Sequence, residues 1–146
     1  MAGHLGELRY LYVGSADAGR DLAWYCDVLR AELVFDFAHF GTRVAGVRLL
    51  EGGPTILLAE HRPVPSVLPI IAVENLQETM ESLKARGWVA DGPTFGIPNG
   101  PCVTFHDPSG NQVALFENRN PEALEREYQN PENPHAVREH NERGDA

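Results

Sequence analysis

The sequence lacks the features that mark secreted and membrane proteins. No apolar run approaches the ~20 residues that a membrane-spanning helix needs, and the first residues do not have the basic-then-apolar order of a secretory signal. The chain has only two cysteines, Cys26 and Cys102, in separate predicted elements. This pattern suits buried free thiols in a reducing compartment, so we expect a cytoplasmic protein.

Basic clusters are also missing. The formal net charge is -9 and no Lys/Arg-rich run occurs, which argues against nucleic acid or a membrane surface as partner. No phosphate-binding loop, dinucleotide fingerprint or nucleophile elbow is present. Gly52 and Gly53 indicate a hairpin turn, with no helix after it to cradle a phosphate.

What the sequence does contain is a repeated order of strands and one helix. Apolar content of 42% and charged content of 23% are ordinary for a globular protein. In the first half, apolar periodicity predicts a strand, a helix capped by Ser15 or Asp17, and three more strands. These strands are expected at residues 8–13, 33–39, 44–50 and 55–59.

The second half repeats this order after a proline-containing linker at residues 62–66. A strand is predicted at 68–73, followed by a helix that Asn75 caps and Gly87 ends. A strand is expected to begin at 88–90 and a Gly/Pro-containing loop to follow at 94–100. The last strands are predicted at 101–106 and 112–117. Neither half can bury its apolar face alone, so the two should pack together.

The predicted domain therefore covers residues 1–118, with modules at about 7–61 and 67–118. Residues 119–146 form a polar tail punctuated by Asn-Pro pairs. Pro121 indicates the start of a short helix through about Tyr128, and composition predicts disorder for the rest of the tail.

Several short motifs occur in this frame. Residues 24–29 read Trp-Tyr-Cys-Asp-Val-Leu in the first helix, residues 84–87 end the second, and residues 107–111 read Asp-Pro-Ser-Gly-Asn before the last strand. Together with the duplicated order, they resemble the vicinal oxygen chelate superfamily, which includes glyoxalase I, ring-cleaving dioxygenases and bleomycin-resistance proteins. The resemblance implies an α+β fold of two βαβββ modules whose curved mixed sheets enclose a cleft, usually in a homodimer.

In metalloenzymes of that superfamily, four His or Glu side chains bind a divalent ion, one on the first and one on the last strand of each module. The matching positions in this chain are Leu8, Leu57, Leu68 and Ala114. None of these side chains can bind a metal, so no metal or other cofactor is expected.

Side-chain alternation along the strands predicts what lines the cleft instead. The expected ligand contacts are apolar, with two tyrosines and a glutamine as polar groups; they are Tyr10, Tyr12, Leu57, Leu68, Ile70, Gln112, Ala114 and Phe116. The opposite set should face the helices; it comprises Leu11, Val13, Ile56, Leu58, Ile71, Val73, Val113 and Leu115.

Other candidate groups are scattered. His39 and His106 are candidate catalytic bases, with Tyr10 or Tyr12 as acid; a site using His61 or Glu60 is a further alternative, and end-segment histidines such as His135 and His140 are expected to be solvated. Arg43 or Arg48 could hold a carboxylate or lie on the surface. Asp107 is expected to stabilise a hairpin turn rather than to act in catalysis.

Three functions fit this sequence. The first is binding of a small, partly aromatic organic molecule in the apolar cleft, without a metal. The second is a metal-independent or atypical-metal lyase, isomerase or dioxygenase-like activity in the same cleft. The third is an interaction domain without a ligand.

Overall fold

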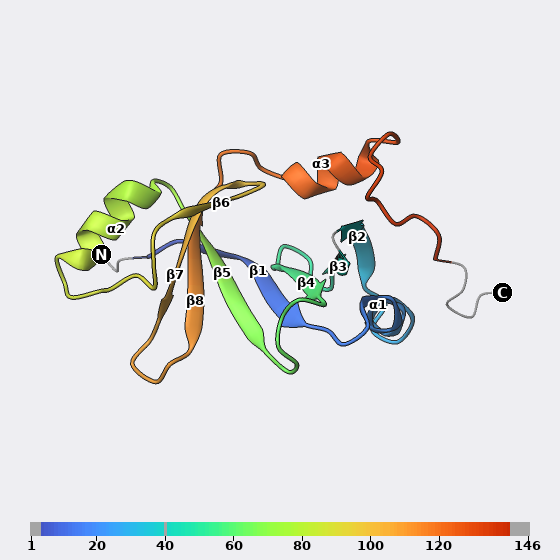
Figure 1. Ribbon diagram of the computed structural model, residues 1–146, viewed down its shortest axis with the longest axis horizontal. Helices are drawn as coiled ribbons and strands as arrows, with labels where there is room; N and C mark the ends of the chain where they lie inside the picture. The colour runs from blue at the N-terminus through green and yellow to red at the C-terminus, as the bar shows by residue number, and fades with distance from the viewer. Residues whose placement is uncertain (1–3, 40, 141–146) are drawn as a thin grey trace. The chain divides into compact units, whose positions relative to one another are not determined.

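The computed structural model describes residues 4–39 and 41–140, which form two compact units (Figure 1). The N-terminal unit contains Tyr10–Val67 and the chain from Leu124 onward. The central unit contains Leu68–Ala123 and the segment that ends at Arg9. None of the helices in the described residues is long and apolar enough to cross a membrane.

The N-terminal unit holds four strands and a helix in the predicted order. The elements are β1 (Glu7–Gly14, in this unit from Tyr10), α1 (Ala18–Asp27), β2 (Glu32–His39), β3 (Thr42–Arg48) and β4 (Thr55–Ala59). The strands lie in the order β2-β3-β4-β1. Strand β1 pairs parallel with β4, and the other neighbours pair antiparallel.

The central unit repeats this arrangement. Its elements are β5 (Val67–Val73), α2 (Leu76–Lys84), β6 (Phe95–Ile97), β7 (Gly100–His106) and β8 (Gln112–Glu117). The strand order is β5-β8-β7-β6, again with one parallel pair, β5 with β8. Figure 1 shows β5, β8 and β7 side by side. The predicted α+β fold of two βαβββ units is confirmed.

Each helix covers one face of its own strands, as the alternation predicts. Leu22 of α1 packs in a cluster with Ala45, Val47 and Leu58, and Ile56 lies against that cluster. The corresponding cluster under α2 has the members Val73, Leu76, Met80, Val103 and Leu115, with Ile71 and Leu83 packed against it. The opposite face of each sheet is therefore the face on which the sequence places the ligand contacts.

The turn between β7 and β8 is structural, as predicted. One carboxylate oxygen of Asp107 accepts hydrogen bonds from the backbone amides of Ser109 (3.0 Å) and Asn111 (2.8 Å). Gly110 has a φ of 91°, which a residue without Cβ adopts at little cost. These bonds hold the pKa of Asp107 below its ordinary value, the side-chain amide of Asn111 contributing most.

Two sequence-based expectations in this region are wrong. Residues 88–90 form no strand; Trp88 and Ala90 pack against the α2 cluster instead. The short strand β6 lies later, at Phe95–Ile97, within the segment expected to be a loop. Its three residues pair with the start of β7 across a tight turn, a length too short for period-2 alternation to reveal.

The tail is ordered well beyond its short helix, contrary to the disorder expected from composition. Helix α3 spans Ala123–Gln129. Beyond it, Ala136 forms an isolated antiparallel bridge with Phe37 of β2. The backbone amide of Ala38 donates to the carbonyl of His135 (2.9 Å), and the amide of Val137 donates to that of Asp36 (2.7 Å). The tail thus pairs with strand β2; residues 141–146 lie outside the described residues.

Candidate functional site

In the N-terminal unit, the sheet face opposite α1 is apolar and carries both predicted tyrosines. Tyr10 and Leu57 are buried, with 6% and 7% of their surfaces exposed. Tyr12 lies beside Leu57 in the parallel pairing of β1 with β4. Phe35 is fully buried on this face, its ring over Gly46, where a Cβ atom would come within 2.7 Å of the ring.

Tyr12 is the centre of a polar cluster on this face. Its hydroxyl lies 2.5 Å from Nε2 of His61, and Nδ1 of His61 lies 3.5 Å from the hydroxyl of Thr42. The guanidinium carbon of Arg62 lies 5.5 Å from the centre of the Tyr12 ring. Burial raises the pKa of Tyr12, and the nearby Arg62 charge partly offsets this rise. The hydroxyl is therefore protonated at neutral pH and can donate to His61.

In the central unit, the face opposite α2 is also largely apolar. Predicted contacts are buried here, among them Leu68 (5% exposed), Ile70 (7%) and Phe116 (0%). Ala114 is 1% exposed and pairs with Ile70 on one side and Thr104 on the other. Leu68, Ile70, Ala114 and Phe116 thus form an uncharged apolar surface, called the apolar floor below.

A polar cluster that sequence reasoning missed borders this floor. Asp91, in the loop after α2, accepts hydrogen bonds from Nδ1 of His106 (2.7 Å), the hydroxyl of Thr104 (2.9 Å) and the side-chain amide of Gln112 (3.4 Å). Strand pairing places His106 opposite Gln112 and Thr104 opposite Ala114, so these side chains share the face of the floor. The predicted residues His106 and Gln112 are thus brought together by a carboxylate.

The hydrogen bonds that Asp91 accepts within this cluster determine its protonation state. The hydrogen bond from His106 is the largest cause that lowers the pKa of Asp91, so the carboxylate is ionised at neutral pH. An aspartate that accepts from Nδ1 orients the imidazole and leaves Nε2 as its outward-facing ring nitrogen. The arrangement can support proton transfer at Nε2.

The other predicted polar candidates are engaged elsewhere. The ring of His39 contacts that of His135 in the tail, with ring centres 3.7 Å apart and ring planes tilted by 57°. Arg43 makes a two-point contact with the fully buried carboxylate of Asp36, at 2.9 and 2.7 Å. His140 also contacts Asp36 (2.8 Å) with its side chain 12% exposed, so the expectation that His140 is solvated is wrong.

Arg48 and Glu60 likewise have structural partners. Arg48 lies 3.3 Å from Glu32 at the surface. Glu60 accepts a hydrogen bond from the backbone amide of Ala18 at the start of α1. The arginines of β3 are therefore not free to bind a ligand carboxylate, and Glu60 has a helix-capping role.

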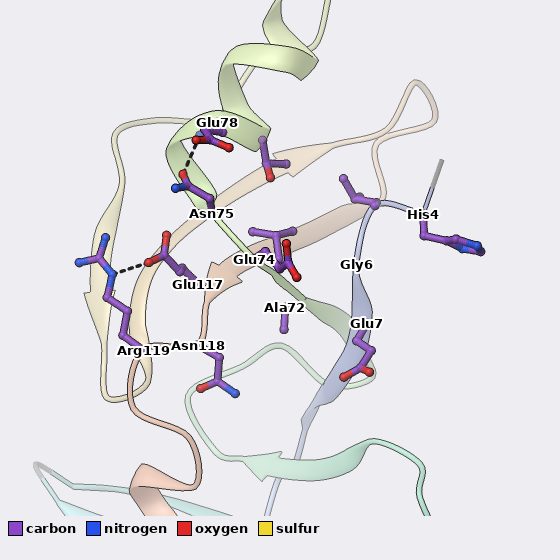
Figure 2. A pocket seen from close by; sticks show the side chains of 13 residues that line it. His4, Gly6, Glu7, Ala72, Glu74, Asn75, Glu78, Glu117, Asn118 and Arg119 are labelled. Atoms are coloured by element: carbon purple, nitrogen blue, oxygen red, sulfur yellow. Dashed lines mark hydrogen bonds and ion pairs between the residues drawn. The ribbon is translucent and has the colours of Figure 1, made fainter. Parts of the chain in front are cut away.

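A separate pocket of about 880 Å³ lies in the central unit at the start of α2 (Figure 2). The side chains that line it include the carboxylates of Glu7, Glu74, Glu78 and Glu117. Glu117 accepts from the amide of Leu76, and Asn75 caps the amide of Glu78. Acidic and amide side chains of the protein thus already accept from these two helix N–H groups, which are not available to an external anion.

Comparison with known proteins finds similarity in structure alone. No family model and no curated protein matches the chain. Methylmalonyl-CoA epimerase from Mycobacterium tuberculosis superimposes with a TM-score of 0.68 at 20% identity, over 80% of this chain and 91% of that one. The hypothetical protein BH1468 from Bacillus halodurans superimposes with a TM-score of 0.66 at 16% identity, over 78% and 95%.

The chain has the vicinal oxygen chelate fold. A third structure of this kind is a Streptomyces coelicolor methylmalonyl-CoA epimerase variant in complex with 2-nitronate-propionyl-CoA, at a TM-score of 0.61 and 15% identity, over 78% of this chain and 95% of that one. The TM-scores of these superpositions show that the fold is shared. At identities of 15–20%, the chemistry has to be inferred from the residues of this chain itself.

The divalent metal that the vicinal oxygen chelate fold implies does not fit the matching residues. The four positions that the family resemblance matches to metal ligands are Leu8, Leu57, Leu68 and Ala114, and hydrocarbon side chains offer no electron pair to a metal. Leu57, Leu68 and Ala114 are buried, while Leu8 is 46% exposed. Among the described residues, no group of three or more His, Cys, Asp or Glu side chains is arranged to hold a metal ion.

Proposed function

We propose that this protein binds a small, partly aromatic organic molecule on one of the apolar sheet faces opposite its helices, without a metal ion at the positions the fold usually uses. The observation that carries this proposal is the side-chain set on those faces. Leu57 and Ala114 stand where metal ligands are expected, and Tyr12 with its His61 partner supplies a polar group beside Leu57. Apolar walls with a few placed polar groups are the usual make-up of a small-molecule site.

The structural neighbours give this proposal further support. A methylmalonyl-CoA epimerase with the same fold holds 2-nitronate-propionyl-CoA, so the fold accommodates an organic ligand. Aromatic rings such as those of Tyr10 and Tyr12 can stack on a flat ligand at little entropic cost.

The test is a thermal-shift screen with aromatic organic compounds, with propionyl-CoA included. A ligand that binds the folded state raises the melting temperature, by an amount that grows with the ratio of ligand concentration to Kd. Tyr12→Phe removes the hydroxyl and keeps the ring, so it should weaken a hit by about tenfold, the typical effect of one hydrogen bond. Tyr25→Phe, at a half-buried tyrosine of α1, is the matched control.

The outcomes separate the hypotheses. A shift that Tyr12→Phe reduces and Tyr25→Phe does not supports a site at Tyr12. A shift that Tyr12→Phe leaves unchanged places the ligand elsewhere. If no compound raises the melting temperature, the binding proposal fails and an interaction domain without a ligand is favoured.

Acid–base catalysis is a second candidate, favoured by the Asp91–His106 pair. An oriented imidazole beside an apolar floor could move a proton of the bound molecule through Nε2. Each hit should therefore be incubated with the protein and examined for turnover by mass spectrometry. Turnover that His106→Gln abolishes and Asp91→Asn lowers would support catalysis; an unchanged ligand supports binding alone.

We further propose that the protein is a cytoplasmic homodimer, as the fold family suggests. Sedimentation equilibrium of the purified chain tests the dimer directly. A mass equal to the chain's 16.1 kDa at all concentrations would contradict it.

A further inference from the structure

Arg62 carries a positive charge that no acidic side chain of the described residues neutralises. The ion pairs of the described residues that involve arginine use Arg9, Arg20, Arg43, Arg48 and Arg119. Arg62 is half-buried, and its Nε–H is shielded from solvent without a hydrogen-bond partner. A buried donor without a partner costs free energy, and the described protein groups supply no acceptor that recovers this cost.

The fold fixes Arg62 beside the apolar face. It lies three residues after the end of β4, in a turn where its amide donates to the carbonyl of Ala59 (3.4 Å). The next residues are held against β1, because the amide of Gly14 donates to the carbonyl of Ser66 (3.1 Å). A Cβ atom at Gly14 would lie only 1.8 Å from the carbonyl oxygen of Pro63, so this approach requires glycine.

The neighbours of Arg62 complete a site for an anion joined to an aromatic ring. The guanidinium lies near the Tyr12 ring at 5.5 Å, and the Tyr12 hydroxyl contacts His61. Tyr12 and His61 add hydrogen-bonding groups, while Leu57 beside Tyr12 offers an apolar surface. The net charge of the chain is -9 and repels anions in general, so the attraction for an anion here comes from the local charge of Arg62.

We propose that Arg62 binds the carboxylate of the ligand, so that the ligand is an aromatic carboxylic acid. This proposal rests on the proposed function and names its ligand class. The planar guanidinium presents paired N–H donors whose spacing matches the two oxygens of a carboxylate. The aromatic part would then lie on the apolar face beside Tyr12 and Leu57.

The experiment compares aryl carboxylates with their neutral amides, which have nearly the same shape. The probes are benzoate, 1-naphthoate and indole-3-carboxylate, each with its carboxamide, measured by calorimetric titration of the full chain. The carboxylates should bind about ten- to a hundredfold more tightly than the amides, the range expected for charge-assisted hydrogen bonds. Arg62→Gln should abolish this preference and Arg62→Lys should keep part of it, since lysine retains the charge without the paired donors.

Arg86→Gln, at an exposed arginine of the central unit, makes the same charge change as a control and should leave the preference intact. A direct readout is the Nε–H proton resonance of Arg62, identified by its loss in Arg62→Lys, which should shift on addition of 1-naphthoate and not of 1-naphthamide.

Failure of this proposal differs from failure of the proposed function. If acids and amides bind equally, or if Arg62→Gln keeps the preference, the carboxylate site is wrong and binding of aromatic molecules stands. If no probe binds and the thermal-shift screen finds only neutral ligands, the carboxylate site is again wrong. If neither experiment finds a ligand, the proposed function fails as well.

Discussion

Glu60 and Glu117 have the same role in the two units, each accepting a hydrogen bond from the backbone amide of the first residue of its helix. Glu60 Oε2 lies 2.9 Å from the amide nitrogen of Ala18, and Glu117 Oε1 lies 2.9 Å from that of Leu76. The side chain before each helix acts alike, because Asp17 and Asn75 accept from the third residue of their helices. The duplication therefore extends to the hydrogen bonds that start each helix.

Glu117→Gln should make the protein less stable near neutral pH. The side chain of Arg119, followed by the Leu76 amide, holds the pKa of Glu117 below its ordinary value of 4.5. A carboxyl group with a lowered pKa in the folded state stabilises the protein above that ordinary value and loses its effect as the pH falls through the lowered pKa. The melting-temperature difference between variant and wild type should therefore be largest above pH 5 or so and shrink in acid.

Glu51→Gln, at an exposed position of the β3–β4 turn, is the control for the loss of one negative charge. It should leave the melting temperature nearly unchanged across the same pH range. A Glu117→Gln curve parallel to that of Glu51→Gln at all pH values would contradict the capping role of Glu117.

Arg43→Met should destabilise the N-terminal unit by about 3 kcal/mol, because it leaves the fully buried Asp36 with fewer compensating partners. Arg48→Met is a matched control on the same strand, since its partner Glu32 is exposed; such a surface pair contributes about 0–1 kcal/mol. Urea unfolding measures both. An equal loss of unfolding free energy in the two variants would show that the burial of Asp36 does not strengthen the contribution of its ion pair to stability.

Cys102 should react slowly with thiol reagents in the folded protein. Burial raises the pKa of its thiol to about 11, so the reactive thiolate is scarce at neutral pH. Cys26 is half-buried rather than buried as the sequence predicts, and it should react first. Mass spectrometry after brief iodoacetamide treatment, with Cys102→Ala to assign the sites, measures the order. Fast alkylation of Cys102 in the folded state would contradict this.

Much of the fold could be predicted because its signals are local. The apolar run of strand 55–59, the Asn75 cap and the Gly87 stop each arise within a few residues. The face that meets each helix follows from side-chain alternation along the strands, and Ile56 and Leu115 lie on it as predicted.

What could not be predicted depends on contacts between distant residues. The pairing of Ala136 with Phe37 joins segments whose composition gives no hint of each other. The sequence identifies Asp91 only as a loop residue, and its hydrogen bond with His106 depends on the position of β7. Arg62 reads as part of a linker, and its place beside Tyr12 results from the turn after β4. In the last two cases a polar side chain acquires its role from a neighbour that the sequence does not identify.

The most direct test of the central claim is calorimetric titration of a confirmed aromatic ligand before and after chelation with EDTA. Because leucines and an alanine occupy the positions that the family resemblance matches to metal ligands, we expect the same affinity in both preparations, and no change on addition of Mn²⁺ or Zn²⁺. Loss of binding on chelation, restored by one equivalent of a divalent metal, would contradict the account.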